Sequence, residues 1–164
     1  MKSLIGMLAL GGVLALSACG DNRVDPDRRY LVEPRASAAD TIGLHVNETP
    51  ELRRLINKYS AEYQVPPELV HRVIIRESHH RPGARNGPYY GLMQILPATA
   101  RGMGYGGSAN GLLDAETNLK YGVKYLRGAY LVADGNQDAA VKWYSRGYYY
   151  EAKRKGLLEE TGLR

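Results

Sequence analysis

The sequence predicts an all-α fold, a single helical domain of modest size. Apolar residues recur at helical spacing in several segments after residue 48, and stretches rich in glycine and proline separate these segments. No segment shows the sustained alternation of a half-buried strand, and there is no internal repeat. A chain of 164 residues is long enough for one such domain, which we place at 49–164.

The first 18 residues are predicted to lie outside this domain. They combine an early lysine, an apolar stretch over 4–16 and small residues before Cys19, as a secretory signal does. The ending "LSAC" resembles the lipobox of bacterial lipoproteins, which implies cleavage before Cys19 and a lipid on that residue. Gly20 in the next position implies sorting to the outer membrane. The alternative is an ordinary signal peptide with a stray cysteine.

The composition indicates which classes of molecule the protein could bind. The net charge of +5 suits an anionic partner such as cell-wall polymer, nucleic acid or a membrane surface, and export makes nucleic acid an unsuitable one. The sequence has 13 tyrosines and no phenylalanine, and tyrosine offers both an apolar face and a hydroxyl to a carbohydrate. The alternative is a core that simply uses tyrosine. A single cysteine excludes an internal disulfide.

Each element follows from local signals along the chain. Residues 19–48 are polar, are broken by prolines and have no sustained period, so we expect a tether. Thr49 is a suitable N-cap for the first helix. Asp114 should cap the long helix and Gly135 should end it, with Tyr121, Tyr125, Leu131 and Val132 on its buried side. The predicted helices are 49–63, 66–78, about 96–103, 112–135, 136–149 and 150–156, with irregular segments at 81–91 and 104–111.

Glu77 is the first candidate for chemistry. In a helix over 66–78, steps of about 100° place it inside the arc formed by Leu69, Val70, Val73 and Ile74. A carboxyl group held in apolar surroundings has a raised pKa and can donate a proton near neutral pH. The alternative is a glutamate paired with Arg72, Arg76 or Arg81.

The segments that follow Glu77 carry a specific resemblance. Glu77-Ser78, then "GLMQILPATA" 14 residues later, then "TNLKYGVKYL" and "AAVKWYSRG", follow the order found in lytic transglycosylases of the soluble (SLT) type. The resemblance covers about 55–150. It implies the lysozyme-like helical fold and an enzyme that cleaves the MurNAc–GlcNAc bond of peptidoglycan.

The resemblance also implies roles for individual residues. Glu77 matches the family's single catalytic acid, and Ser78 matches its usual neighbour. Gly91, Met93 and Gln94 belong to the motif that forms one wall of the sugar cleft, with Met93 and Gln94 as substrate contacts. Tyr144 matches a tyrosine that hydrogen-bonds the acid, while Asn118 and Gly122 match a packing motif on the long helix.

This chain departs from the family pattern at two site positions. Asn86 stands where the family usually has a serine that supports the acid. Ser145 replaces the asparagine of "AYNAG", and Arg146 adds a charge beside it. A serine hydroxyl reaches less far than an amide, so substrate binding should differ here. Tyr148, Tyr149 and Tyr150 follow, either as a stacking surface at the cleft edge or as terminal packing.

No second acid is apparent. Asp114, Glu116, Asp138 and Glu151 all lie at helix starts or in the terminal element, whereas ordinary glycosidases use two carboxylates. The resemblance implies that one residue acts as acid and then as base, while the muramyl 6-hydroxyl attacks and leaves a 1,6-anhydro end. We expect no cofactor and no metal site, with His79 and His80 facing solvent.

The sequence therefore predicts a periplasmic lytic transglycosylase, anchored to the membrane by a lipid on Cys19 and acting on peptidoglycan strands. Two alternatives stay open: a lysozyme-type hydrolase that uses water, and a binding or scaffold protein of the same fold without turnover. The resemblance also extends to enzymes that work beside secretion or cell-wall machinery, which are possible protein partners.

Overall fold

The computed structural model describes residues 43–164. The predicted signal sequence, Cys19 and most of the predicted tether lie outside these residues. The described part contains six α-helices, a 3-10 helix and one small hairpin, so the prediction of an all-α fold is confirmed. Within it, no helix combines the length and the apolar character needed to cross a membrane.

The first two helices begin where the sequence places them. Helix α2 spans Pro50–Tyr63, and the Thr49 hydroxyl caps it by accepting from the Leu52 N–H at 3.2 Å. Gln64 ends α2 in the left-handed conformation. Helix α3 spans Pro67–Glu77, so Glu77 is its last helical residue.

The segment after α3 is more ordered than predicted. Strands β1 (Arg85–Asn86) and β2 (Tyr89–Tyr90) form an antiparallel hairpin, although the sequence indicated no strand. Gly87, with φ of +56°, and a proline form its two-residue loop, and glycine at the first loop position is what a type II′ turn requires. Each strand has only two residues, too few to produce an alternating pattern.

Two short helices then lead to the long one. Helix α4 spans Pro97–Gly102, and the 3-10 helix η2 spans Ala109–Leu113. Of the segment 104–111 that was predicted to be irregular, residues 109–111 therefore belong to η2.

Helix α5 spans Ala115–Val132, and the Asp114 carboxylate caps it as predicted, accepting from the Thr117 N–H at 2.8 Å. The helix ends three residues before the predicted end at Gly135. Of the four residues predicted on its buried side, Val132 is fully buried and Tyr121, Tyr125 and Leu131 are only half-buried. The fully buried apolar side chains of α5 are Leu119, Val123, Leu126, Ala129 and Val132.

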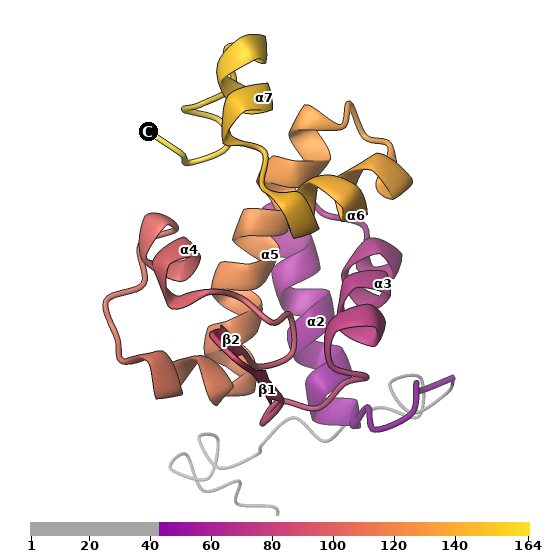
Figure 1. The fold of residues 1–164 in the computed structure, drawn as a ribbon. Coiled ribbons are helices and arrows are strands. Elements are labelled where there is room, and N and C mark those ends of the chain that lie inside the picture. Colours follow the sequence, from indigo (N-terminus) through magenta and orange to yellow (C-terminus); the bar gives the residue numbers. More distant parts are fainter. Residues whose placement is uncertain (1–42) are drawn as a thin grey trace, which may run out of the picture. The chain divides into compact units, whose positions relative to one another are not determined.

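Helices α6 (Gln137–Arg146) and α7 (Tyr149–Lys155) complete the fold. Figure 1 shows α5 in the middle of the domain, with α2 alongside it and α6 across one end. The main core lies between these helices and α3, and a smaller apolar cluster packs beneath the hairpin and η2. The arrangement leaves the end of α3, the hairpin and the end of α6 facing one another.

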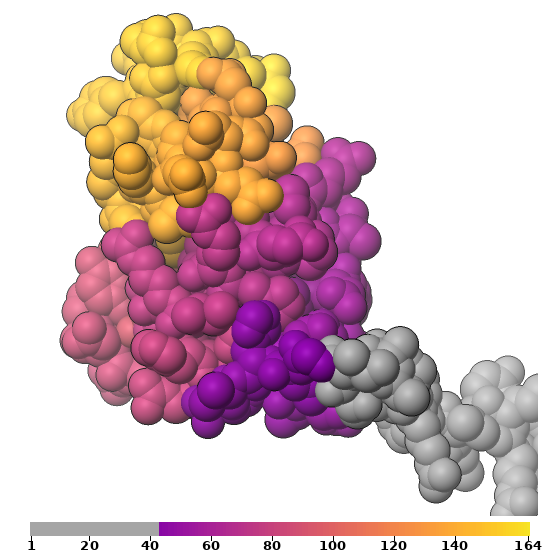
Figure 2. Space-filling model, turned by 90° about the vertical axis from the view of Figure 1, so that its right-hand side faces the viewer, coloured from indigo at the N-terminus to yellow at the C-terminus, as the bar shows by residue number. Residues whose placement is uncertain are grey.

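The residues just before α2 pack onto the domain. Glu48 is buried and its carboxylate accepts from Arg53 Nε at 2.6 Å and Nη2 at 2.7 Å. The Asn47 side-chain amide donates to the His79 carbonyl at 3.0 Å. Figure 2 shows this segment, in the darkest indigo, lying on the surface formed by the magenta residues. Residues 43–48, placed by the sequence in the tether, therefore share contacts with α2 and with the turn after α3.

Candidate active site

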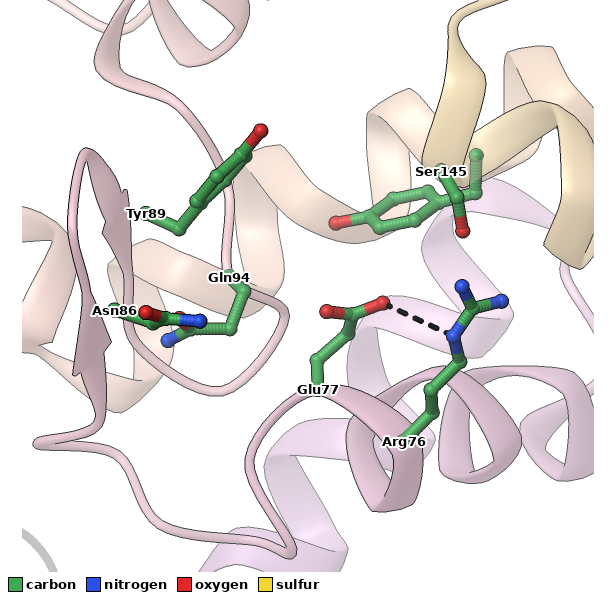
Figure 3. Close-up of a pocket in the computed structure, with 7 residues that line it drawn as sticks. Arg76, Glu77, Asn86, Tyr89, Gln94 and Ser145 are labelled. Atoms are coloured by element: carbon green, nitrogen blue, oxygen red, sulfur yellow. Dashed lines mark ion pairs between the residues drawn. The ribbon is translucent and has the colours of Figure 1, made fainter.

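Glu77 lies on the floor of a groove. A cavity of about 310 Å³ opens over its side chain, and two further cavities share lining residues with this one, so the three form one continuous groove. Figure 3 shows Glu77 and Arg76 rising from α3, with Asn86, Tyr89 and Gln94 on the opposite wall and Ser145 above. The residues that line the first cavity are Arg76, Glu77, Asn86, Tyr89, Gln94, Tyr144 and Ser145.

The surroundings of Glu77 favour its protonated form. Partial burial raises the pKa of the Glu77 carboxyl above its usual range, and the Arg76 guanidinium opposes this rise. The distance from Arg76 Nε to Glu77 Oε1 is 3.7 Å, which is too long for a hydrogen bond. Of the other two arginines considered as partners, Arg72 pairs with Asp138 and Arg81 donates to the Ser78 carbonyl. Among the described residues, Arg76 is therefore the one cation paired with the Glu77 carboxyl group, and it forms no hydrogen bond to it.

Gln94 shapes the opposite wall. Its backbone has a φ of +46°, a left-handed conformation that is uncommon for a residue other than glycine. Its side-chain amide nitrogen donates to the carbonyls of Ala84 at 3.1 Å and Gly91 at 2.8 Å. These bonds tie the segment after α3 to the segment after the hairpin, and they hold Gln94 at the groove.

Met93, which the resemblance implied as a substrate contact, and the predicted site residues Ser78 and Gly91 lie behind the groove wall instead. Met93 is fully buried and packs against α5, where a side chain at Gly122 would meet its sulfur at 2.6 Å. Ser78 is also buried, and its hydroxyl donates to the Ile74 carbonyl at 3.3 Å. Gly91, with φ of +75°, is pressed so closely against Asn118 and the Leu112 carbonyl that no side chain would fit. These residues support the wall from within.

Asn118 joins that wall to α5. It is completely buried, and its side-chain oxygen accepts from the Met93 N–H at 2.9 Å. Its amide nitrogen donates to the carbonyls of Tyr90 and Leu112 at 2.8 and 2.7 Å. The packing role expected for Asn118 on the long helix thus consists of three hydrogen bonds, one to Met93 within the "GLMQ" motif and two to carbonyls outside it.

Tyr144 and Ser145 approach from α6. The Tyr144 hydroxyl donates to the Met93 carbonyl at 2.8 Å, whereas the resemblance implied a bond to Glu77. Burial and then the charge of Glu77 raise the pKa of Tyr144 well above its usual range. The Ser145 hydroxyl is exposed at the groove and donates to the Val141 carbonyl within its own helix at 3.0 Å. Tyr144 is therefore both part of the wall and close enough to Glu77 to be affected by its charge.

Glu77 is the only acidic residue that lines the groove within the described part of the chain. The other acids considered from the sequence have partners outside the groove: Asp114 caps α5, Glu116 pairs with Lys58, Asp138 with Arg72, and Glu151 with Arg154.

The three tyrosines after α6 divide between two roles. Tyr148 is buried and its hydroxyl donates to the Tyr125 carbonyl at 2.8 Å, so it packs the core. Tyr149 and Tyr150 are exposed beside Trp143 in a separate cavity, which adjoins the groove only through Arg146 and its neighbouring glycine. Terminal packing, one of the two expectations, holds for Tyr148.

A cluster of histidines on the other side of α3 was missed in the sequence. His80 was expected to face solvent but is buried, and its ring Nε2 lies 3.1 Å from Nδ1 of His71. His45, Glu48 and His71 each place one ligand-type atom within 4.8 Å of the others, which contradicts the expectation that no such cluster exists. Burial lowers the pKa of His71 to about 4 and lowers that of His80, so both rings are neutral at pH 7.

The backbone after α3 explains why His80 was missed. Both His79 and His80 have positive φ, of +52° and +58°, so the chain reverses directly after Glu77 and turns His80 back under α3. The sequence does show that His71 and His80 lie on either side of a predicted helix end. Their contact, however, depends on the left-handed backbone of His79 and His80, which no local sequence pattern predicts.

Comparison with known families matches residues 54–157 to the Transglycosylase SLT domain. This match covers all of the groove-lining residues named above. Proteins with this domain are in general lytic transglycosylases that cleave peptidoglycan. No solved structure matched the chain. Because the matched region includes more than half of the sequence and carries the fold expected of it, the chain belongs to the SLT transglycosylase family.

Proposed function

We propose that this protein is a lytic transglycosylase that cleaves the MurNAc–GlcNAc bond of peptidoglycan, with Glu77 as acid and then base. The observation that carries the proposal is a single carboxyl group of raised pKa on the floor of a groove that, among the described residues, offers no second carboxylate. An ordinary glycosidase needs a second acid as base or nucleophile. A substrate hydroxyl can take the place of that second group.

In the first step the Glu77 carboxylic acid gives its proton to the glycosidic oxygen, and the bond from the anomeric carbon to that oxygen breaks. In the second step the muramyl 6-hydroxyl attacks the anomeric carbon and the Glu77 carboxylate takes the hydroxyl proton. The new bond closes the 1,6-anhydro ring, and Glu77 is again protonated. No water is consumed, and the proton that Glu77 gives up in the first step is regained in the second.

The groove supplies groups suited to a sugar chain. Asn86 and Gln94 present amides on one wall, and the Gln94 oxygen can accept from a sugar hydroxyl because its two N–H bonds are used within the protein. Tyr89 is exposed at the groove and offers a ring face for stacking. Arg76 and Arg146 give the groove a positive rim that suits the carboxylates of peptidoglycan.

Mass analysis of muropeptides tests the proposal. Purified cell wall digested by the protein should yield products with 1,6-anhydro ends, each lighter by one water than the hydrolysed form. Reducing ends would instead identify a lysozyme-type hydrolase. Absence of any release, with wall binding intact, would identify a binding or scaffold protein.

We also propose that the protein is a periplasmic lipoprotein anchored through Cys19 to the outer membrane, on the strength of the signal sequence and the "LSAC" motif. Two or more acyl chains hold a protein firmly on a membrane, whereas one chain holds it only reversibly. Cys19→Ser should therefore move the protein from the membrane fraction to the soluble fraction. A variant that still sediments with membranes after signal cleavage would contradict the anchor.

A further inference from the structure

We propose that His45, Glu48 and His71 form a binding site for a divalent transition-metal ion, with Zn²⁺ as the best fit, that fastens residues 43–48 to α3. The site lies outside the groove of Glu77 and is independent of the proposed reaction. Its ligands come from two segments, the stretch before α2 and the middle of α3.

The distances suit a small cation after a modest closure. The three ligand atoms lie within 4.8 Å of one another, and Glu48 Oε1 is 3.8 Å from His71 Nε2. Two zinc bonds of 2.0–2.1 Å at a tetrahedral angle separate their ligand atoms by about 3.4 Å. The oxygen–nitrogen pair is therefore a few tenths of an ångström from the required spacing, and it is too far apart for a direct hydrogen bond.

His80 orients His71 for this role. Nδ1 of His71 lies 3.1 Å from Nε2 of His80, and in the tautomer that carries its proton on Nδ1, His71 donates to His80. That tautomer leaves the lone pair of His71 Nε2 pointing toward Glu48. Metal-binding histidines in proteins usually donate their other ring N–H to a nearby acceptor, which fixes the ring in this way. The His45 ring lies beside both rings, with centroids 4.7 Å from His71 and 5.0 Å from His80, which places it next to the same site.

The hydrogen bonds of Glu48 leave one oxygen suited to a metal ion. Its Oε2 accepts from Arg53 Nη2 and from the His45 backbone N–H, whereas Oε1 accepts from Arg53 Nε. The side of Oε1 that faces His71 can therefore bind a cation. The Arg53 charge opposes that cation, so we expect micromolar affinity, weaker than that of a closed structural zinc site.

The ligand set selects the class of metal. Two imidazoles and one carboxylate favour zinc and its neighbours, while Ca²⁺ and Mg²⁺ prefer sites made of oxygen ligands. Glu48 and His71 are buried, but His45 is exposed and leaves an open path for the ion and for a water as fourth ligand. The structure thus has two preformed ligands and a third that can close over the ion.

Isothermal titration of the full chain, prepared without a histidine tag, tests this proposal with ZnCl₂ and with MgCl₂. We expect one Zn²⁺ per chain and no measurable binding of Mg²⁺. His45→Ala removes an exposed ligand without disturbing the core, and it should weaken Zn²⁺ binding at least tenfold. His79→Ala is the matched control, because His79 is an exposed histidine of the same turn and contributes no ligand atom to the site. It should bind Zn²⁺ as the unaltered chain does.

Co²⁺ gives a second readout through its visible spectrum. The expected complex shows d–d bands of a four-coordinate site without a thiolate charge-transfer band, since the three proposed ligands include no cysteine. Three results would overturn the proposal: no saturable binding of Zn²⁺ at micromolar concentration, equal binding by His45→Ala, or a thiolate band. None of these measurements involves peptidoglycan, so their failure would leave the proposed transglycosylase activity untouched.

Discussion

Glu48 and Glu77 are two glutamates withdrawn from solvent on the two sides of α3, and their carboxyl groups behave in opposite ways. The Glu48 side chain has no exposed surface, and burial alone would raise its pKa, but hydrogen bonds from Arg53 and the His45 N–H outweigh burial and lower it. The Glu77 side chain is 24% exposed, yet burial prevails and its pKa is raised. The difference lies in the donors nearby. Burial raises the pKa of a carboxyl group only where no hydrogen-bond donors stabilise the carboxylate, so the more deeply buried glutamate is not the one suited to donate a proton.

The largest expected effect is on turnover. Glu77→Gln keeps the shape of the side chain and removes the acid proton, so release of muropeptides should fall by at least about 10²–10⁴-fold, the usual contribution of general acid–base catalysis. Folding, measured by circular dichroism, and sedimentation with purified wall should be retained. Turnover equal to that of the unaltered chain would show that Glu77 is not the acid.

The second effect is on stability and concerns the other glutamate. Glu48→Gln leaves the Arg53 guanidinium facing a neutral amide, so the free energy of unfolding should fall by about 2–3 kcal/mol. Urea denaturation in the presence of EDTA measures the ion pair without any contribution from a bound metal. A loss as small as that of an ordinary surface substitution would mean that Arg53 finds equivalent acceptors after the change.

The third effect is a dependence of folding stability on pH that arises from Glu77. Its pKa is raised in the folded state above the ordinary value of 4.5, so the folded chain holds more protons than the unfolded chain just above that pH. Stability contributed by Glu77 therefore falls as pH rises from about 4.5 toward neutral. Thermal melts of Glu77→Gln should show a gain in melting temperature over the unaltered chain at pH 7 that shrinks toward pH 4. A gain that is independent of pH would contradict the raised pKa.

The smallest effect is expected at Ser145, where the chain departs from its family. The Ser145 hydroxyl bonds within its own helix, so its replacement by the family's asparagine should leave turnover unchanged or lower. We expect the activation free energy to change by less than about 0.5 kcal/mol, which is roughly twofold in rate. Muropeptide release by Ser145→Asn measures this. A large gain from a nearly inactive parent would support the scaffold alternative.

The helices could be predicted because their signals are local. Thr49 and Asp114 act as caps within three residues of the groups they bind, and the apolar spacing of α3 places Glu77 on its inner face. The groove position of Gln94 also followed from its motif. What could not be predicted depends on backbone reversals: the positive φ of His79 and His80 buries one histidine, and the turn at Gly87 creates a hairpin from four residues.

Met93 illustrates a different limit. The motif predicted a wall of the sugar cleft, and its residue Gln94 lines the groove whereas Met93 is buried behind it. A motif does not tell which side of a wall a residue faces. Gly122 on α5 leaves room for the Met93 side chain, and that space is visible only after α5 packs behind the wall. His45 was missed for a related reason, because its partners are 26 and 35 residues away, at His71 and His80.

The three hydrogen bonds of Asn118 also bear on the order in which the molecule opens. Asn118 holds Met93 and Tyr90, which are 25 and 28 residues earlier in the chain, so these bonds exist only while the first turns of α5 are docked. The amide proton of Met93 should therefore exchange with deuterium only in the rare openings that detach α5, on the slow timescale of the core. Although it lies directly behind the groove wall, the Met93 backbone should behave in exchange as part of the central helix.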